Sequence, residues 1–397
     1  MLKPGSRGLT ILLGALAAMT ALAVDMSLPS LPTLGVAFAA PPETVQLTLS
    51  LFLVGYAAGQ LVYGPLSDRF GRRRMLLIGL AVYTVAGFAC AVSPSMEILV
   101  SARLVQGFGA CVGPILGRAV VRDHMAGARA AQTLSYITLT MSVAPMVAPL
   151  FGGVLLKHFG WQAIFLTLGV VGLLLSVATY LGFGESLKQP DPNALKVRRL
   201  ALNASTFFTS RRTVGFALVN AFVFAGLFAF LSGSPFVLIQ AYGVAPDAFG
   251  FYFALSAVGL MLGAFGNGRL VHRLPGETVM RGAFVLLVGS GAALVVIGWT
   301  RAGGAVGIML PIMTYVMALG MILPNATVAA MEKLPHMAGM AASLLGAIQM
   351  GSGSLSGYIV ATFYDGTPMA MAGTLAAAAV LAVLSYVTLV RPRAQAA

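Results

Sequence analysis

The sequence predicts an all-α integral membrane protein whose twelve transmembrane helices form two six-helix bundles. Of the 397 residues, 58% are hydrophobic and 9% are charged, a balance that soluble domains do not have. Apolar stretches recur along the chain at about the 20 residues that a helix needs to cross a hydrocarbon layer of roughly 30 Å. The longest charged interval, 184–212, lies near the middle of the chain and separates two sets of six helices.

Each expected helix is an apolar run between breaks that are charged or rich in proline and glycine. In the first half the helices are expected at 9–34, 44–66, 75–92, 98–121, 132–156 and 161–183. In the second half they are expected at 213–241, 247–270, 280–299, 303–326, 337–362 and 370–390. The chain is therefore divided into an N-terminal bundle (1–183), a linker (184–212) and a C-terminal bundle (213–397).

The basic residues predict the orientation. If the N-terminus lies inside, 21 of the 24 lysines and arginines fall in inner segments, whereas Lys157 and Arg301 fall in outer loops and Arg103 falls within a helix. The positive-inside rule then places both termini and the linker in the cytoplasm. A basic cytoplasmic face explains the isoelectric point of 10.2 without a nucleic-acid partner, and it favours contact with anionic lipid.

The N-terminus has some features of a signal peptide, because Lys3 and Arg7 precede an apolar run that ends in "ALA" at 21–23. Cleavage there would leave eleven spans and place Asp25 at the new terminus, so we expect this segment to remain as the first helix. Cys90 and Cys111 fall in expected spans, which predicts space-filling thiols and no disulfide. No cluster of His, Cys and Asp has metal-ligand spacing, so neither a metal ion nor another cofactor is expected.

A short pattern recurs after the second helix of each half. "GPLSDRFG" occupies 64–71 and "GRLVHRLP" occupies 268–275, and three positions agree at an offset of 204, close to half the chain. Both copies lie on the expected cytoplasmic side, which predicts a parallel repeat with a pseudo-twofold axis along the membrane normal. The matching residues are Gly64, Leu66 and Arg69 in the first copy and Gly268, Leu270 and Arg273 in the second.

"GPLSDRFGRRR" at 64–74 supplies an acid and fixed positive charge between two helices. One interpretation is a loop that only anchors topology. The pattern also resembles the cytoplasmic motif of the major facilitator superfamily, which implies that Asp68 and Arg72 form part of an inner gate and that Asp123, in "RAVVRD", completes the charge cluster. In the second copy His272 stands where Asp68 would be, so a matching C-terminal gate charge is not expected. The gate candidates are Gly64, Asp68, Arg69, Gly71, Arg72 and Asp123.

"RLVQGFGA" at 103–110 opens the fourth helix with Arg103 and Gln106 on one helical face. Arg103 is close enough to the outer end to snorkel to the interface. The stretch also resembles the fourth-helix motif of proton-coupled drug exporters, which implies that Arg103 takes part in proton transfer.

"APMVAPLFGG" at 144–153 places two prolines and two glycines in the fifth helix. Prolines remove backbone hydrogen bonds and bend a helix, and glycines allow a neighbouring helix to approach, so a structural kink explains much of the pattern. The stretch also resembles the Gly-Pro-x-x-Gly-Gly element of antiporters, with Ala148 in place of the first glycine. The candidates in this motif are Pro145, Pro149, Gly152 and Gly153.

Several further stretches narrow the resemblance. "DMSLPSLP" (25–32), "SGSPFVLIQAYGVAPDAFGFYFAL" (232–255), "GNGRLV" (266–271), "LPNATVAAM" (323–331) and "AGMAASLLGAIQMGSG" (338–353) resemble the Bcr/CflA branch of drug:proton antiporters. This branch includes bicyclomycin and chloramphenicol exporters of the bacterial inner membrane. The resemblance implies antibiotic resistance by drug efflux, although it does not identify the drug.

Asp25 is an acid within the first span, where an aspartate costs roughly 2.5–3.5 kcal/mol at the centre of a membrane helix. At 1.5 Å per residue, Asp25 is expected about 24 Å along the outward first helix and Arg103 about 8 Å below the outer surface. The two depths agree within a few Å for a core of about 30 Å. We therefore expect Asp25 and Arg103 to serve proton coupling, the alternative being a structural ion pair.

The sequence thus favours a proton-driven antiporter, and not an enzyme, that exports amphiphilic compounds by alternating access. An importer or exporter of a small metabolite on the same fold is the alternative, and a receptor or an intramembrane enzyme is a third class that lacks a supporting motif. The expected partners are drugs, protons and the lipid bilayer, and we expect a monomer. Candidates for an apolar and aromatic cavity, each with helix packing as its alternative, are Tyr56, Gln60, Gln106, Tyr136, Asn220, Phe224, Phe230, Gln349 and Tyr358.

Overall fold

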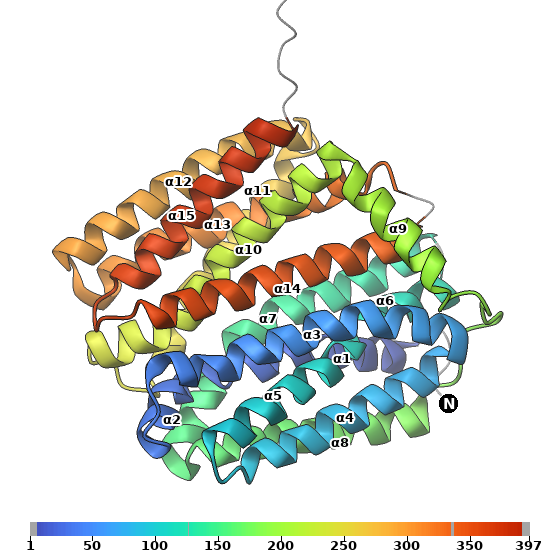
Figure 1. Cartoon of the computed structure of the whole chain (residues 1–397), viewed down its shortest axis with the longest axis horizontal. Coiled ribbons are helices and arrows are strands. Elements are labelled where there is room, and N and C mark those ends of the chain that lie inside the picture. Colours follow the sequence, from blue (N-terminus) through green and yellow to red (C-terminus); the bar gives the residue numbers. More distant parts are fainter. Residues whose placement is uncertain (1–5, 126, 335–336, 391–397) are drawn as a thin grey trace, which may run out of the picture. The chain divides into compact units, whose positions relative to one another are not determined.

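A computed structural model describes residues 6–125, 127–334 and 337–390 (Figure 1). Lys3, Arg391 and Arg393, which contribute to the expected orientation, lie outside these residues. Across the described ranges the chain forms helices and no strand. It divides into two compact units, Met1–Leu200 and Ala201–Ala397, and this boundary falls within the interval 184–212 that the sequence indicates as a linker.

The first unit contains the helices that the sequence predicts, with two of the spans interrupted. The elements are α1 (Arg7–Asp25), η1 (Leu28–Ser30), α2 (Leu31–Ala37), α3 (Pro42–Phe70), α4 (Arg72–Ala91), α5 (Met96–Ala110), α6 (Val112–His124), α7 (Gly127–Phe159) and α8 (Trp161–Gly182). Only Gly71 separates α3 from α4, so the motif expected in a loop is almost wholly helical.

Proline explains both interruptions, because it has no N–H for the carbonyl four residues before it. Pro29 leaves the carbonyl of Asp25 without its helical donor, and α1 ends at Asp25. Pro114 does the same to the carbonyl of Ala110, where α5 ends. The Thr20 hydroxyl donates to that Ala110 oxygen at 3.3 Å, so a side chain from α1 replaces the missing backbone donor.

The second unit has the same pattern of long helices and one short helix that the sequence does not predict. Its elements are α10 (Arg211–Pro235), η2 (Phe236–Ala241), α11 (Phe249–Leu270), α12 (Gly276–Thr300), α13 (Gly304–Met331), α14 (Ala338–Thr362), α15 (Met369–Ser385) and η4 (Tyr386–Val390). The additional helix, α9 (Val197–Thr209), lies in the linker and crosses the boundary between the units.

The two units pair their helices in the same order. In the first unit α1 packs against α7, α3 against α5, and α4 against both α5 and α8 (Figure 1). In the second unit the corresponding pairs are α10 with α14, α11 with α13, and α12 with both α13 and α15. Because α4 begins at Arg72 and α12 at Gly276, the offset of 204 (276 − 72) recurs in the structure and supports the internal repeat.

Eleven helical segments in the described part of the chain, 20 to 31 residues long, are apolar enough to cross a membrane. The twelfth expected span, 337–362, forms α14, which has a full-length helix of 25 residues. Its sequence "GAIQMGSGSLSG" places glycines, serines and Gln349 in the middle of the helix, which lowers its hydropathy.

Candidate functional site

At the C-terminal end of α1, backbone carbonyl oxygens and the carboxyl group of Asp25 lie within one helical turn. Asp25 is the last residue of α1 and is 4% exposed. Beyond it, the Ser27 N–H bonds to the Val24 carbonyl at 3.2 Å in a tighter turn, and the Ser27 hydroxyl donates to the same carbonyl at 2.8 Å. The Ala23 carbonyl, which lies 3.3 Å from the Ser27 hydroxyl, therefore lacks its helical N–H donor and can accept a donor from another helix.

Arg103 on α5 supplies that donor. Its Nη2 donates to the Ala23 carbonyl at 3.2 Å, and its Nε donates to the Thr48 carbonyl of α3 at 3.1 Å. Its Nη1 donates to Gln106 Oε1 at 2.7 Å, one turn along α5. Arg103 is 1% exposed, and it reaches α1 two residues before Asp25, so the two depths predicted from the sequence agree.

Aromatic faces complete the surroundings of Arg103. Its guanidinium carbon lies 4.4 Å from the ring centroid of Phe52 and 5.6 Å from that of Phe165, within the range of cation–π attraction. No ion pair joins Arg103 to Asp25, both of which the structure describes. The negative end of the α1 dipole and the amide of Gln106 thus stabilise the cation in place of a carboxylate.

The fifth-helix motif lies against the end of α1. A Cβ atom at Gly152 would overlap the carbonyl oxygen of Met26, the residue after Asp25, so a glycine is needed for this close approach. Pro149 and Gly153 are buried, and Pro145 is partly buried, all within the continuous helix α7. The motif therefore sets the position of the α1 terminus that carries Asp25.

The motif between α3 and α4 forms a charge cluster with the end of α6, which we call the gate cluster: Asp68, Arg72 and Asp123. Arg72 Nη1 lies 2.5 Å from Asp68 Oδ1, and its Nε donates to Asp123 Oδ2 at 3.0 Å. The Ser67 hydroxyl also accepts from Arg72 Nη1, at 2.6 Å. The three gate residues named from the sequence are thus brought together, and Arg72 is 3% exposed.

The linker contributes to this cluster, which the sequence did not predict. Glu185 Oε1 accepts the backbone N–H of Arg72 at 2.9 Å, and Oε2 accepts that of Arg73 at 3.1 Å. The Ser186 hydroxyl donates to Asp123 Oδ2 at 3.2 Å, and the Asp191 N–H donates to the Asp68 carbonyl at 2.9 Å. The sequence signal that could have indicated this contact is the lone acid directly after the sixth span, in "GES".

Two other candidates of the motif lie outside the cluster. The guanidinium of Arg69 lies over the ring of Phe70, 5.3 Å from its centroid, and Arg69 is exposed. The Gly64 carbonyl accepts the Ser67 hydroxyl at 2.8 Å, which orients Ser67 toward Arg72. Gly64 therefore supports the cluster indirectly, and Arg69 faces away from it.

The second copy of the motif uses different chemistry. His272 and Arg273 are exposed, and an amide pair replaces the ion pair, with Asn325 Nδ2 donating to Asn267 Oδ1 at 2.6 Å between α13 and α11. The described part of this unit has its own charged group at the start of α12. There Glu277 accepts from Arg212 and from the Tyr386 hydroxyl, the latter at 3.3 Å.

The cavity candidates of the first unit occupy different environments. Tyr56 and Gln60 are buried on α3, close to each other and to Thr20 of α1. Gln106 is fully buried and holds Arg103. Tyr136 on α7 is 51% exposed.

In the second unit a polar chain links three helices. Asn220 of α10 is fully buried, donates to the Thr327 hydroxyl at 3.0 Å and accepts from Gln349 of α14. The aromatic candidates separate: Phe224 packs against Phe228, Phe230 stacks on Phe253 inside the unit, and Tyr358 is 43% exposed. The structure therefore brings Asn220 and Gln349 together and places Phe230 in the packed interior.

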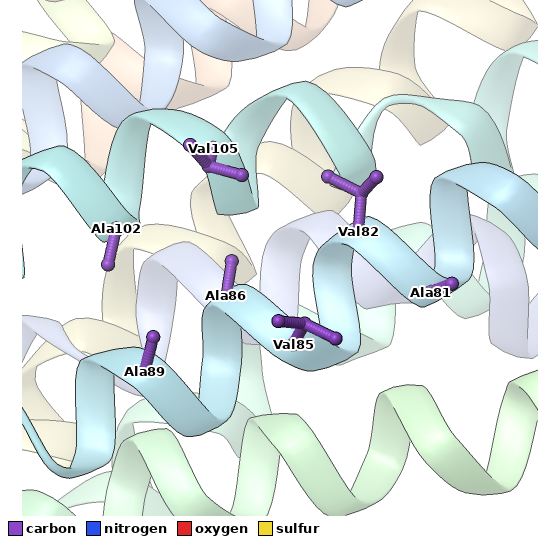
Figure 2. A pocket seen from close by; sticks show the side chains of 7 residues that line it. All are labelled: Ala81, Val82, Val85, Ala86, Ala89, Ala102 and Val105. Atoms are coloured by element: carbon purple, nitrogen blue, oxygen red, sulfur yellow. The ribbon is translucent and has the colours of Figure 1, made fainter.

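A groove of about 440 Å³ lies between α4 and α5. Figure 2 shows its lining, formed by Ala81, Val82, Val85, Ala86, Ala89, Ala102 and Val105. No polar side chain lines it, and neither Arg103 nor Gln106 is among its lining residues. Because a selective site needs a few polar groups to orient its ligand, we do not assign the candidate site to this groove.

Comparisons with known proteins agree with this arrangement. A family model described as the Major Facilitator Superfamily matches residues 13–357. The chain is 33% identical over 377 residues to a bicyclomycin resistance protein homolog of Haemophilus influenzae, with 94% of each chain covered. It is 34% identical over 387 residues to YdgK, an uncharacterized MFS-type transporter of Bacillus subtilis, with 97% of this chain and 96% of that one covered. A solved D-xylose-proton symporter has the same fold, with a TM-score of 0.77 at 18% identity over 96% of this chain and 98% of that chain.

Proposed function

Because the chain belongs to the major facilitator superfamily, we propose that it is a proton-driven exporter of amphiphilic drugs that works by alternating access. Export is favoured over import by the resemblance of the fifth-helix motif to an element of antiporters. Gly152 of this motif fits closely against Met26, the residue after Asp25. The drug class is favoured by the likeness to a relative named for bicyclomycin resistance and by the motifs shared with the Bcr/CflA branch. Bicyclomycin-like and chloramphenicol-like compounds are the substrates to test first.

The observation that carries the proposal is the separation of Asp25 from Arg103. Arg103 donates its hydrogen bonds to the Ala23 and Thr48 carbonyls, to Gln106 and to the Ser27 hydroxyl. Asp25 remains buried without a cationic partner. An ionised carboxylate is costly to bury unpaired, and it is further disfavoured at the C-terminal end of a helix dipole. We therefore assign a neutral, proton-carrying Asp25 to this conformation.

Proton release then follows from a change of partner. When Asp25 ionises, its carboxylate competes with the Ala23 carbonyl, two residues away, for the guanidinium of Arg103. A conformation in which Arg103 turns to Asp25 favours the ionised acid, and the conformation described here favours the protonated acid. This difference in proton affinity between two states couples proton entry to drug exit.

The proposal also fixes orientation and location. Both termini lie in the cytoplasm, the gate cluster closes the cytoplasmic side, and the protein resides in the bacterial inner membrane as a monomer. Its partners are the drug, the proton and the surrounding lipid. The energy source is the proton gradient, with no cofactor.

The test is a compound screen in a bacterial strain that lacks its own efflux pumps. Expression of the chain is expected to raise the inhibitory concentration of at least one amphiphilic antibiotic. An uncoupler that collapses the proton gradient is expected to restore accumulation of that drug in the cells. Export that persists at full rate with the uncoupler would contradict proton coupling. Proton-dependent uptake of a metabolite, with no protection against any compound, would contradict drug export.

A further inference from the structure

The gate cluster has a component on the linker. Glu185 follows α8 by three residues, and its carboxylate accepts four backbone N–H groups, two from the start of α4 and two from its own segment. The two α4 donors belong to Arg72 and Arg73, at distances of 2.9 and 3.1 Å. A carboxylate there satisfies free N–H groups and complements the positive end of the α4 dipole.

The second glycine of the motif makes room for this carboxylate. Gly71 has φ +97°, a left-handed conformation that other residues rarely adopt, and a Cβ atom there would lie 2.5 Å from Glu185 Oε2. The backbone N–H groups of Arg72 and Arg73 are thereby presented to Glu185 without obstruction. The motif glycine is thus matched to an acid more than 110 residues later in the chain.

The next residue of the linker binds the other side of the gate cluster. The Ser186 hydroxyl donates to Asp123 Oδ2 at 3.2 Å, and the same oxygen accepts Arg72 Nε at 3.0 Å. Ser186 is 4% exposed. Neighbouring residues therefore bridge the start of α4 and the end of α6, the two helix ends that Arg72 and Asp123 join.

This bridge cannot persist when the two helix ends separate. Consecutive Cα atoms are about 3.8 Å apart, so Glu185 and Ser186 cannot both keep their partners once Arg72 and Asp123 part. We propose that the linker segment 185–191 is a working part of the cytoplasmic gate, in which Glu185 is a positioning residue that holds Arg72 in the closed cluster. The inference rests on the alternating-access function proposed above.

The linker continues to an anchor in the second unit. The side chain of Phe207 on α9 is fully buried with Ala217, Leu334, Met337, Ala341, Leu344 and Leu345 of that unit. One part of the linker is thus bound to the gate cluster by polar contacts, and a later part is bound to the C-terminal bundle by an apolar side chain. Release of the contacts of Glu185, Ser186 and Asp191 would therefore free one end of the linker while the other stays attached.

Hydrogen–deuterium exchange of the purified chain tests this role without a substrate. In Glu185→Gln and Ser186→Ala, we expect exchange to rise at least twofold in peptides covering 68–75 and 119–125. At the opposite helix ends, in peptides covering 38–43 and 157–161, we expect exchange to fall, because the equilibrium shifts toward the state that is open at the gate. Glu97→Gln is the matched control, since Glu97 bonds within its own first turn of α5, and it is expected to change neither pair of peptides.

Opposite changes at the two ends distinguish gate opening from general loss of stability, which raises exchange at both ends. Unchanged exchange at 38–43 and 157–161, or a rise at both ends, would overturn the inference. In the double variant with Asp123→Asn, the effect of Glu185→Gln is expected to be less than additive, because both act on Arg72. A chain that exports no drug but shows opposite exchange changes would refute the proposed function and leave this inference standing.

Discussion

At the scale of residues, the central feature is a buried arginine without a carboxylate partner. Arg103 is held by four oxygens, from Ala23, Ser27, Thr48 and Gln106, and by the faces of two aromatic rings. Each hydrogen bond to a charged group contributes about 1.5–3 kcal/mol, so together these contacts offset a large part of the desolvation of the cation. The planar guanidinium suits this set because its donors point in several fixed directions.

Arg103→Lys tests whether geometry, and not charge alone, is required. A lysine keeps the charge, but its compact ammonium cannot reach Ala23, Thr48 and Gln106 together or stack between two rings. We expect proton-coupled export to be lost and the melting temperature in detergent to fall. Arg301→Lys, at an exposed position, is the control and is expected to export normally. Normal export by Arg103→Lys would mean that a positive charge at this depth is sufficient.

At the scale of elements, proline and glycine place the functional groups. Pro29 ends α1 at Asp25 and so exposes carbonyl oxygens to Arg103, and Gly152 allows α7 to lie directly against Met26. These residues belong to "DMSLPSLP" and "APLFGG", two stretches that also carry the resemblance to antiporters. The same residues therefore determine both the local backbone conformation and the environment of Asp25.

Gly152→Ala tests the contact between α7 and the end of α1. The added methyl group would overlap the Met26 carbonyl and displace α1, at a cost of about 1–3 kcal/mol. We expect a lower melting temperature and a reduced rate of export. Gly282→Ala on α12 is the matched control, since no atom lies within 4 Å of its added methyl group and alanine favours a helix by about 1 kcal/mol. Equal behaviour of the two variants would contradict the packing role.

The positions of most membrane-spanning helices could be predicted from the sequence, because long apolar runs indicate spans and charged segments indicate the breaks between them. The agreement in depth between Asp25 and Arg103 and the grouping of Asp68, Arg72 and Asp123 also followed, from helix geometry and from motif resemblance. The acceptors of Arg103 did not, because two of them are backbone carbonyls, which every residue has. The helix α9 and the contacts of Glu185 were missed because the linker carries a polar composition that does not specify a tertiary partner.

At the scale of the whole molecule, the two units repeat their helix pairing but not their chemistry. The first unit ties α4 to α6 through Arg72 and Asp123, whereas the second pairs Asn325 with Asn267 and places Glu277 at the start of α12. The gate cluster thus lies in the first unit, and the second unit has an ion pair between Arg212 and Glu277. We expect loss of the gate cluster to bias the transport cycle as a whole.

Asp68→Asn tests this bias. The substitution removes one of the two carboxylates on Arg72, so we expect the population to shift toward the state that is open to the cytoplasm. Labelling of single cysteines introduced on the two faces measures the shift. Asp365→Asn is the control, because Asp365 is exposed in the turn between α14 and α15 and bonds to Thr367. An unchanged labelling ratio with normal transport would show that Asp68 does not hold the gate.

The most direct test of the account concerns Asp25 as the proton carrier. Purified protein in weakly buffered detergent solution is mixed with a drug that it exports, and the released protons are measured with a pH indicator. The wild type is expected to release protons on drug binding, and so is the control variant Glu43→Gln, which changes a partly exposed acid in the first turn of α3. Asp25→Asn, which keeps the size of the side chain but cannot ionise, is expected to bind the drug and release none. Proton release by Asp25→Asn at the wild-type level would contradict the account and leave Asp25 with a structural role.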